Sequence, residues 1–118
     1  MLVRDFAEMM GFTVATQEMA ENDFQLEGCY IGDLLSNVMG NAKTGQVWLT
    51  VMTNVNVVAV AQLLDLSGIV LLEGNRFDGD ALQRASLEGI PVFMTPDNAY
   101  DTAIRLHGTG LPGARAHQ

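Results

Sequence analysis

The sequence predicts an α/β domain built on a mostly parallel sheet. Three short apolar runs, Val47–Met52, Ile69–Leu72 and Val92–Met94, have the unbroken character of strands buried on both faces. Helical patterns separate these runs, which is typical of βαβ units. Because 118 residues suffice for one core, we expect a single domain with about four to five strands, helices on both faces, and these three strands parallel, joined by right-handed crossovers.

The amino-terminal elements follow from local patterns. Apolar positions over Leu2–Met10 predict a helix, and the alternation over Phe12–Thr16 predicts a strand. A short second strand is expected within Gln25–Ile31. A short helix over Asp33–Met39 is expected to begin at Asp33 and to end at Gly40.

The helix after the Val47 strand has no wide polar face. It is expected to be capped by Asn54 or Asn56 and to run to about Asp65. Its apolar residues go most of the way round: Val57, Val58, Ala59, Val60, Ala61, Leu63 and Leu64. A helix of this kind is buried on more than one side. We therefore expect a homodimer that covers part of this helix or of Asp33–Met39.

Two more helices complete the expected domain over residues 1–108. The first begins at Asp78, ends at Gly89 and turns inward the residues Ala81, Leu82 and Ala85. The last spans Asn98–His107, with one stripe made of Tyr100, Ala103, Ile104 and His107. Residues 109–118 show no periodicity, and we expect a disordered tail.

Charge and composition exclude several partners. The net charge of −8 and a pI near 4.4 argue against nucleic acid and against an anionic membrane surface. The apolar stretches are shorter than the roughly 20 residues of a membrane-spanning helix, and Asp5 interrupts any signal-peptide core. The acidic stretch Gln17–Glu27 is expected to be a solvated loop. With a single cysteine and so no internal disulfide, a cytoplasmic location is expected.

The sequence contains no motif that indicates a nucleotide site, a metal site or a catalytic triad. The segment Gly108–Gly113 matches G-x-G-x-x-G, but it follows a helix instead of a strand. The sequence contains no P-loop. Cys29, His107 and His117 do not fall at metal-ligand spacings, and no serine has a readable His and acid beside it. We expect no catalytic residues, no metal and no cofactor.

Polar residues follow each of the three core strands. Because parallel strands bring their carboxyl ends to one edge, these residues are expected to meet there. The candidate ligand-binding residues are Thr53, Asn54, Asn56, Glu73, Gly74, Asn75 and Arg76, with Thr50, Thr95 and Asp97 at the same edge. A helix start suits an anion or carbonyl, and Arg76 suits a phosphate, which Glu73 opposes. The alternative is that the asparagines only cap, Gly74 only turns the chain, and Arg76 pairs with Glu73 or Asp78.

Several segments together resemble the DRTGG domain family over about residues 2–108. They are Gly32–Met39, Trp48–Thr50, Asn56–Ala61, Ile69–Gly74 and Ala85–Pro91. Where the family has Asp-Arg-Thr this chain has Thr53-Asn54-Val55, and where it has Thr-Gly-Gly this chain has Glu73-Gly74-Asn75. The resemblance implies a small α/β module that accompanies catalytic domains without being one, with free-standing short members in bacteria.

Three classes of function remain open. The first is a non-catalytic regulatory or protein-interaction module, homodimeric, that senses a small molecule at the carboxyl edge of the sheet. The second is a structural subunit of a larger complex, which a second exposed apolar patch would favour. The third is an enzyme that uses the strand-tip residues, for which no nucleophile–base pair is readable.

Overall fold

A five-stranded, mostly parallel sheet forms the centre of the computed structural model, which describes residues 1–16, 19 and 21–113. The strands lie in the order β1-β5-β4-β3-β2. Their bounds are Thr13–Val14 (β1), Gly28–Ile31 (β2), Gln46–Thr50 (β3), Gly68–Leu71 (β4) and Val92–Met94 (β5). Strands β2, β3, β4 and β5 are parallel to one another, and β1 pairs with β5 in the antiparallel direction. The predicted parallel core is confirmed.

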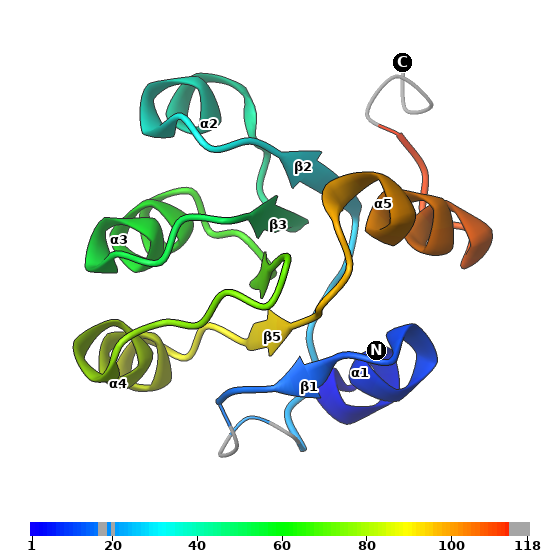
Figure 1. Ribbon diagram of the computed structural model, residues 1–118, viewed down its shortest axis with the longest axis horizontal. Coiled ribbons are helices and arrows are strands. Elements are labelled where there is room, and N and C mark those ends of the chain that lie inside the picture. Colours follow the sequence, from blue (N-terminus) through cyan, green and yellow to red (C-terminus); the bar gives the residue numbers. More distant parts are fainter. Residues whose placement is uncertain (17–18, 20, 114–118) are drawn as a thin grey trace.

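Helices cover both faces of this sheet (Figure 1). Their bounds are Val3–Met10 (α1), Leu35–Asn41 (α2), Val55–Leu63 (α3), Gly79–Glu88 (α4) and Ala99–Gly108 (α5). Each of β2, β3 and β4 is followed in sequence by its spatial neighbour, so connections of one hand place α2, α3 and α4 on one face. After β5 the chain crosses over, and α5 joins α1 on the opposite face.

Two hydrophobic cores flank the sheet because β3 and β4 are buried along their whole length. Trp48 and Ile69 face the α2–α4 layer, whereas Leu49 and Phe93 face α1 and α5. The second core is aromatic, with the rings of Phe6 and Phe93 edge to face at 5.1 Å between centroids. Burial on both faces explains why these strands carry no polar alternation.

Helix α2 departs from its sequence-based description. It begins at Leu35, and Gly40 lies inside it instead of ending it. The expected cap, Asp33, makes no capping hydrogen bond; its carboxylate accepts from the Thr50 hydroxyl and the Val51 N–H. Only Val38 is buried, because this short helix lies at the edge of the layer over β2 and β3.

Helix α5 is rotated relative to the predicted stripe. Tyr100 is 74% exposed and Ile104 53% exposed, whereas Thr102 and Leu106 are buried. The Tyr100 and Ile104 part of the predicted stripe therefore faces away from the core. Two stripes at the i, i+4 spacing compete on this helix, and the rotation is set by Leu106 in the aromatic core and by Arg105 on the end of α1.

The remaining expectations fall at the chain's periphery. Leu111 packs against the aromatic core. The tail prediction, which covers residues 109–118, stays untested, because residues 114–118, His117 among them, lie outside the described residues. The same holds for residues 17, 18 and 20 of the acidic loop. Within the described ranges, no helix has the length and apolar character needed to cross a membrane.

Candidate functional site

At the carboxyl edge of β4 and β5, the two connections that follow these strands leave toward opposite faces of the sheet. After β4 the chain turns to α4 on one face, and after β5 it crosses to α5 on the other (Figure 1). In open α/β sheets, ligands bind in the crevice that opens where neighbouring connections leave in opposite directions. This edge is thus the geometric candidate for a site.

A pocket of about 190 Å³ lies at this edge. Its lining residues come from the start of β1, the β4–α4 loop and the β5–α5 loop: Thr13, Gly74, Asn75, Arg76, Met94, Thr95 and Pro96. Three segments distant in sequence meet because β1 runs antiparallel to β5, with Thr13 opposite Met94.

The β4–α4 loop begins with a tight turn. Glu73 and Gly74 have φ values of +60° and +76°, and the Asn75 N–H donates to the Leu72 carbonyl at 3.1 Å. Two successive positive φ values with this hydrogen bond define a type I′ turn. Gly74 adopts its positive φ without cost, whereas Glu73 is strained by about 1 kcal/mol in its own left-handed conformation. Such strain at an edge loop is a common feature of binding sites.

Backbone hydrogen bonds join this turn to the β5–α5 loop. The Glu73 N–H donates to the Asp97 carbonyl at 2.9 Å, and the Gly74 N–H donates to the Thr95 carbonyl at 3.0 Å. The side-chain amide nitrogen of Asn75, Nδ2, also donates to the Leu72 carbonyl, at 2.8 Å. The pocket wall is therefore fixed before any ligand arrives.

Arg76 is the charged side chain of the pocket. It is exposed, and none of the described carboxylates forms an ion pair with it, so the expected pairing with Glu73 or Asp78 is not what the structure shows. Thr95 is buried, and its hydroxyl oxygen accepts from the Asp97 N–H at 3.2 Å. The pocket thus presents a cation and hydroxyl groups beside an apolar wall of Met94 and Pro96.

The sequence-predicted residues divide into two groups. Gly74, Asn75, Arg76 and Thr95 come together around the pocket. The other predicted residues do not line the pocket: Thr50, Thr53, Asn54, Asn56, Glu73 and Asp97. Asn54 caps α3 by accepting from the Asn56 N–H at 2.9 Å, which matches the capping alternative.

Sequence reasoning missed Thr13, Met94 and Pro96 as pocket residues, and it missed the role of Asp33. The Asp33 carboxylate accepts from the Thr50 hydroxyl at 2.7 Å and from the Val51 N–H at 2.9 Å, which anchors the end of β3. No local signal announces such contacts, since each depends on pairing between distant segments.

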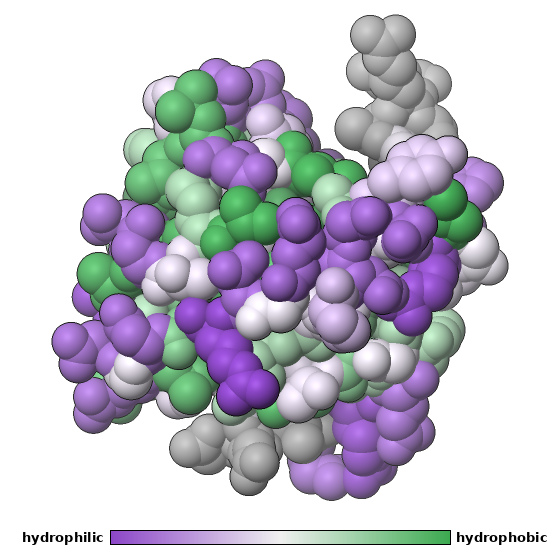
Figure 2. Space-filling view, viewed as in Figure 1, coloured by the Kyte–Doolittle hydropathy of each residue, from purple (hydrophilic) through white to green (hydrophobic). Residues whose placement is uncertain are grey.

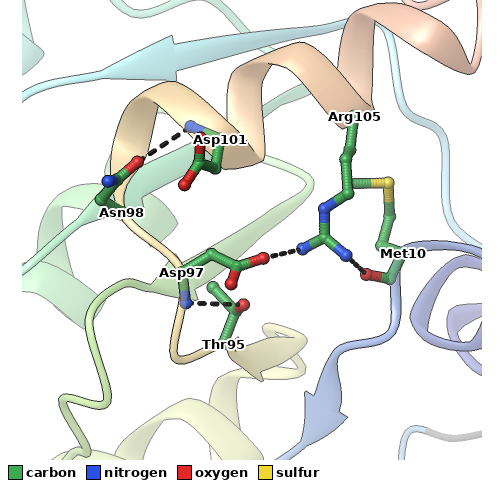
Figure 3. A network of polar contacts seen from close by, with 6 residues as sticks. All are labelled: Met10, Thr95, Asp97, Asn98, Asp101 and Arg105. Atoms are coloured by element: carbon green, nitrogen blue, oxygen red, sulfur yellow. Dashed lines mark hydrogen bonds and ion pairs between the residues drawn. The ribbon is translucent and has the colours of Figure 1, made fainter.

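A polar network holds the other side of the β5–α5 loop (Figure 3). The Arg105 guanidinium donates to the Met10 carbonyl at 2.7 Å and pairs with the Asp97 carboxylate at 2.6 Å. The Asn98 side chain accepts from the Asp101 N–H at 2.9 Å and caps α5. These contacts connect the end of α1, the loop that lines the pocket and α5.

A wider groove of about 610 Å³ runs along the amino-terminal edge of the sheet. Its charged lining residues are Asp23, Glu27 and Asp65, all acidic. The amino-terminal ammonium donates a hydrogen bond to Asp23 and lowers the pKa of that carboxyl. Among the described residues, no three His, Cys, Asp or Glu side chains gather in a metal-binding group. The described side chains that line the groove include acidic ones and no basic one, so the carboxyl edge is the better candidate.

Cys29 is a half-buried small side chain that packs against the aromatic core. Burial raises the pKa of its thiol to about 12, so the nucleophilic thiolate is scarce at neutral pH. Neither Cys29 nor the lone described histidine, His107, which is exposed, belongs to the pocket at the carboxyl edge.

Comparisons with known proteins place the fold. No family model matches the chain, and no curated protein matches it. A solved structure, of the CBS and DRTGG domains of the regulatory region of Clostridium perfringens pyrophosphatase complexed with its activator diadenosine tetraphosphate, aligns with a TM-score of 0.66 and 13% identity. The alignment covers 92% of this chain and 46% of that chain, so this chain spans less than half of its neighbour. The two proteins are related in fold.

Proposed function

We propose that this protein is a regulatory module, without catalytic activity of its own, that binds a small ligand in the pocket at the carboxyl edge of β4 and β5. The observation that carries the proposal is the position of this pocket. It lies where the connections after β4 and β5 diverge to opposite faces, and Arg76 is unpaired with any described acid beside it.

Two further observations support a regulatory role. Among the described residues, the hydroxyl that donates to a carboxylate is that of Thr50, which is buried and lies outside the pocket. The raised pKa of Cys29 makes its nucleophilic thiolate scarce. The structural neighbour is a regulatory region, and it was solved with a small-molecule activator. In a module of this kind, ligand binding would change the contacts of the module's surface with a catalytic partner.

A thermal-shift screen tests the proposal. The panel includes adenine nucleotides, diadenosine tetraphosphate and common metabolic acids, sugars and amines. A ligand raises the melting temperature in line with RT ln(1 + [L]/Kd). The Arg76→Ala variant should lose this shift. Arg84→Ala is the matched control, because it removes the same charge from the exposed surface of α4, where Arg84 pairs with Glu88.

Two results would count against this function. If a ligand binds and Arg76→Ala leaves its affinity unchanged, the site is elsewhere. If the pure protein turns over a substrate, the regulatory assignment fails as a whole.

Self-association is a second function, favoured by the exposed apolar side chains of the α2–α4 layer. These side chains and their exposed fractions are Leu34 (59%), Met39 (48%), Leu63 (69%) and Leu87 (76%). Figure 2 shows apolar surface on this side, broken by polar residues. Since Leu63 lies on α3 and Met39 on α2, a two-fold pairing of this layer would form the homodimer expected from the sequence.

Sedimentation at micromolar concentration tests the homodimer. Leu63→Lys should produce a monomer, because a charge would be buried in the interface. Ile104→Lys is the matched control, since Ile104 is an exposed apolar residue on the opposite face. A wild-type protein that sediments only as a monomer would contradict the homodimer.

The alternative of a structural subunit rests on a separate patch. Tyr100 and Ile104 leave apolar surface on α5, away from the α2–α4 layer. If the homodimer forms and leaves this patch open, α5 is the surface for a different protein.

A further inference from the structure

We infer that the pocket at the carboxyl edge selects a ligand with one small anionic group, a carboxylate or a phosphate, held by Arg76. The inference rests on the function proposed above and adds the chemical class of the ligand. The shared chemistry is a compact oxyanion, and its source is either a small organic acid or the terminal phosphate of a larger molecule.

The first observation is the exceptional state of Arg76 among the described arginines. Each of the others pairs with an acid: Arg4 with Glu21 at 2.7 Å, Arg84 with Glu88 at 3.2 Å and Arg105 with Asp97 at 2.6 Å. The chain has 14 acids and 6 bases. An arginine without a described acidic partner is therefore not the result of a shortage of acids. The planar guanidinium matches carboxylate and phosphate through two parallel hydrogen bonds.

The second observation is the set of neutral donors around Arg76. The Thr13 hydroxyl lies on the exposed start of β1 and has no hydrogen-bond partner within the described residues. The Thr95 side chain is 2% exposed, and its oxygen already accepts from the Asp97 N–H. The proton of the Thr95 hydroxyl thus remains to donate. Two hydroxyl protons and a guanidinium form a lining rich in donors, which suits an oxyanion.

The third observation is size. A volume of about 190 Å³ corresponds to roughly six molecules of liquid water at about 30 Å³ each. Pockets for drug-sized ligands measure about 300–1,000 Å³. The pocket therefore holds an acid of a few carbon atoms, or the phosphate end of a nucleotide whose remainder lies outside. Met94 and Pro96 supply an apolar wall for the carbon part.

Charge opposes a polyanion at the same place. The net charge of −8 and the exposed Glu73 beside Gly74 repel additional negative groups. A single anionic group gains the Arg76 contact without a large penalty, so a monoanion should bind better than a triphosphate relative to its size.

A paired titration followed by backbone amide NMR tests the inference. The probes are acetate, acetamide, inorganic phosphate and ATP. Acetate and acetamide have nearly the same shape and differ in charge. We expect acetate and phosphate, but not acetamide, to shift the amide resonances of Gly74, Asn75 and Thr95. A lower Kd for acetate than for phosphate in these titrations identifies an organic acid as the source, and the reverse identifies a phosphate end.

Variants of Arg76 sharpen the test. Arg76→Gln should weaken acetate or phosphate binding about tenfold or more, as expected for the loss of a hydrogen bond to a charged group. Arg76→Lys keeps the charge and loses the fork, so its affinity should be intermediate. Arg84→Gln removes an equal charge outside the pocket and should leave binding unchanged.

The outcomes separate this inference from the proposed function. Equal binding of acetamide and acetate, or undiminished binding to Arg76→Gln, overturns the anion assignment. If the anions fail while a neutral compound of the screening panel shifts the pocket amides, the anion assignment fails and the ligand-binding function stands. If no compound of the panel shifts them, both fail.

Discussion

Arg105 should contribute more to stability than any other arginine of this domain that the structure describes. Its guanidinium donates to the Met10 carbonyl, pairs with Asp97 and lies 5.9 Å from the ring centroid of Phe12. Helix α1 has no basic residue in its own last turn. Arg105 therefore satisfies a carbonyl at the end of α1 from a position 95 residues away. Figure 3 shows the contacts of Arg105 with Met10 and Asp97. The Arg105→Ala substitution removes these two contacts and the Phe12 contact at once.

The magnitude follows from the exposure of the groups. Arg105 and Asp97 are 41% and 39% exposed, so water screens their ion pair to about 0.5 kcal/mol. The charged hydrogen bond to Met10 contributes about 1 kcal/mol at this exposure, and the Phe12 ring about 0.5 kcal/mol. Arg105→Ala should thus lower the free energy of unfolding by about 2 kcal/mol, which is about 6–10 °C in Tm for a domain of this size.

Urea unfolding of four proteins measures this value and its origin. The wild type, Arg105→Ala, Asp97→Ala and the double variant form a cycle with an expected coupling of about 0.5 kcal/mol. The denaturant slope should not change. Arg84→Ala, which removes an i,i+4 pair, should cost about 0.3–0.5 kcal/mol. If Arg105→Ala costs no more than this control, or if Asp97→Ala costs as much as Arg105→Ala, the α1 contact does not stabilise the domain.

Three other perturbations test separate features. Glu73→Gly should raise the free energy of unfolding by up to about 1 kcal/mol in urea titration, because glycine has no penalty at φ +60°; a loss of stability would refute the strained turn. Asp33→Ala should cost about 2 kcal/mol by the same method, since it leaves the buried Thr50 hydroxyl and the Val51 N–H without their acceptor, and a cost near that of an exposed cap would refute it. Cys29, with a thiol pKa of about 12, should react with a disulfide reagent far more slowly in the native state than in urea at pH 8. Because folding raises this pKa, the thiol lowers stability only as pH rises above the unfolded value near 9; equal labelling rates in both states would contradict its burial.

The elements that depend on neighbouring residues could be predicted from the sequence. The unbroken runs of β3 and β4 indicated strands covered on both faces, and both strands are buried throughout. Asn54 and Asp78 begin α3 and α4 through their side chains, and Gly89 ends α4 in the left-handed conformation. These signals are local, because a cap or a turn depends on the three or four residues around it.

Candidate site residues could be predicted only in part. Gly74, Asn75 and Arg76 follow a strand tip, and the rule for parallel sheets places them at the carboxyl edge. The sequence also placed the β3–α3 residues at that edge, but the pocket forms one strand further along the sheet. The position of the pocket depends on which face of the sheet α4 and α5 cover. No residue in the β4–α4 or β5–α5 loop indicates that face.

Tertiary structure alone decided the remaining contacts. Thr13 reaches the pocket because β1 pairs with β5, and α5 turns Leu106 inward because Arg105 holds the end of α1. Asp33 leaves the helix start because the end of β3 offers it two donors. A sequence determines the hydrophobic period and the caps, since these are interactions over a few residues. The rotation of a helix and the neighbour of an edge strand depend on contacts between residues tens of positions apart, and two faces of similar apolar content, as in α5, are distinguished only when the whole chain packs.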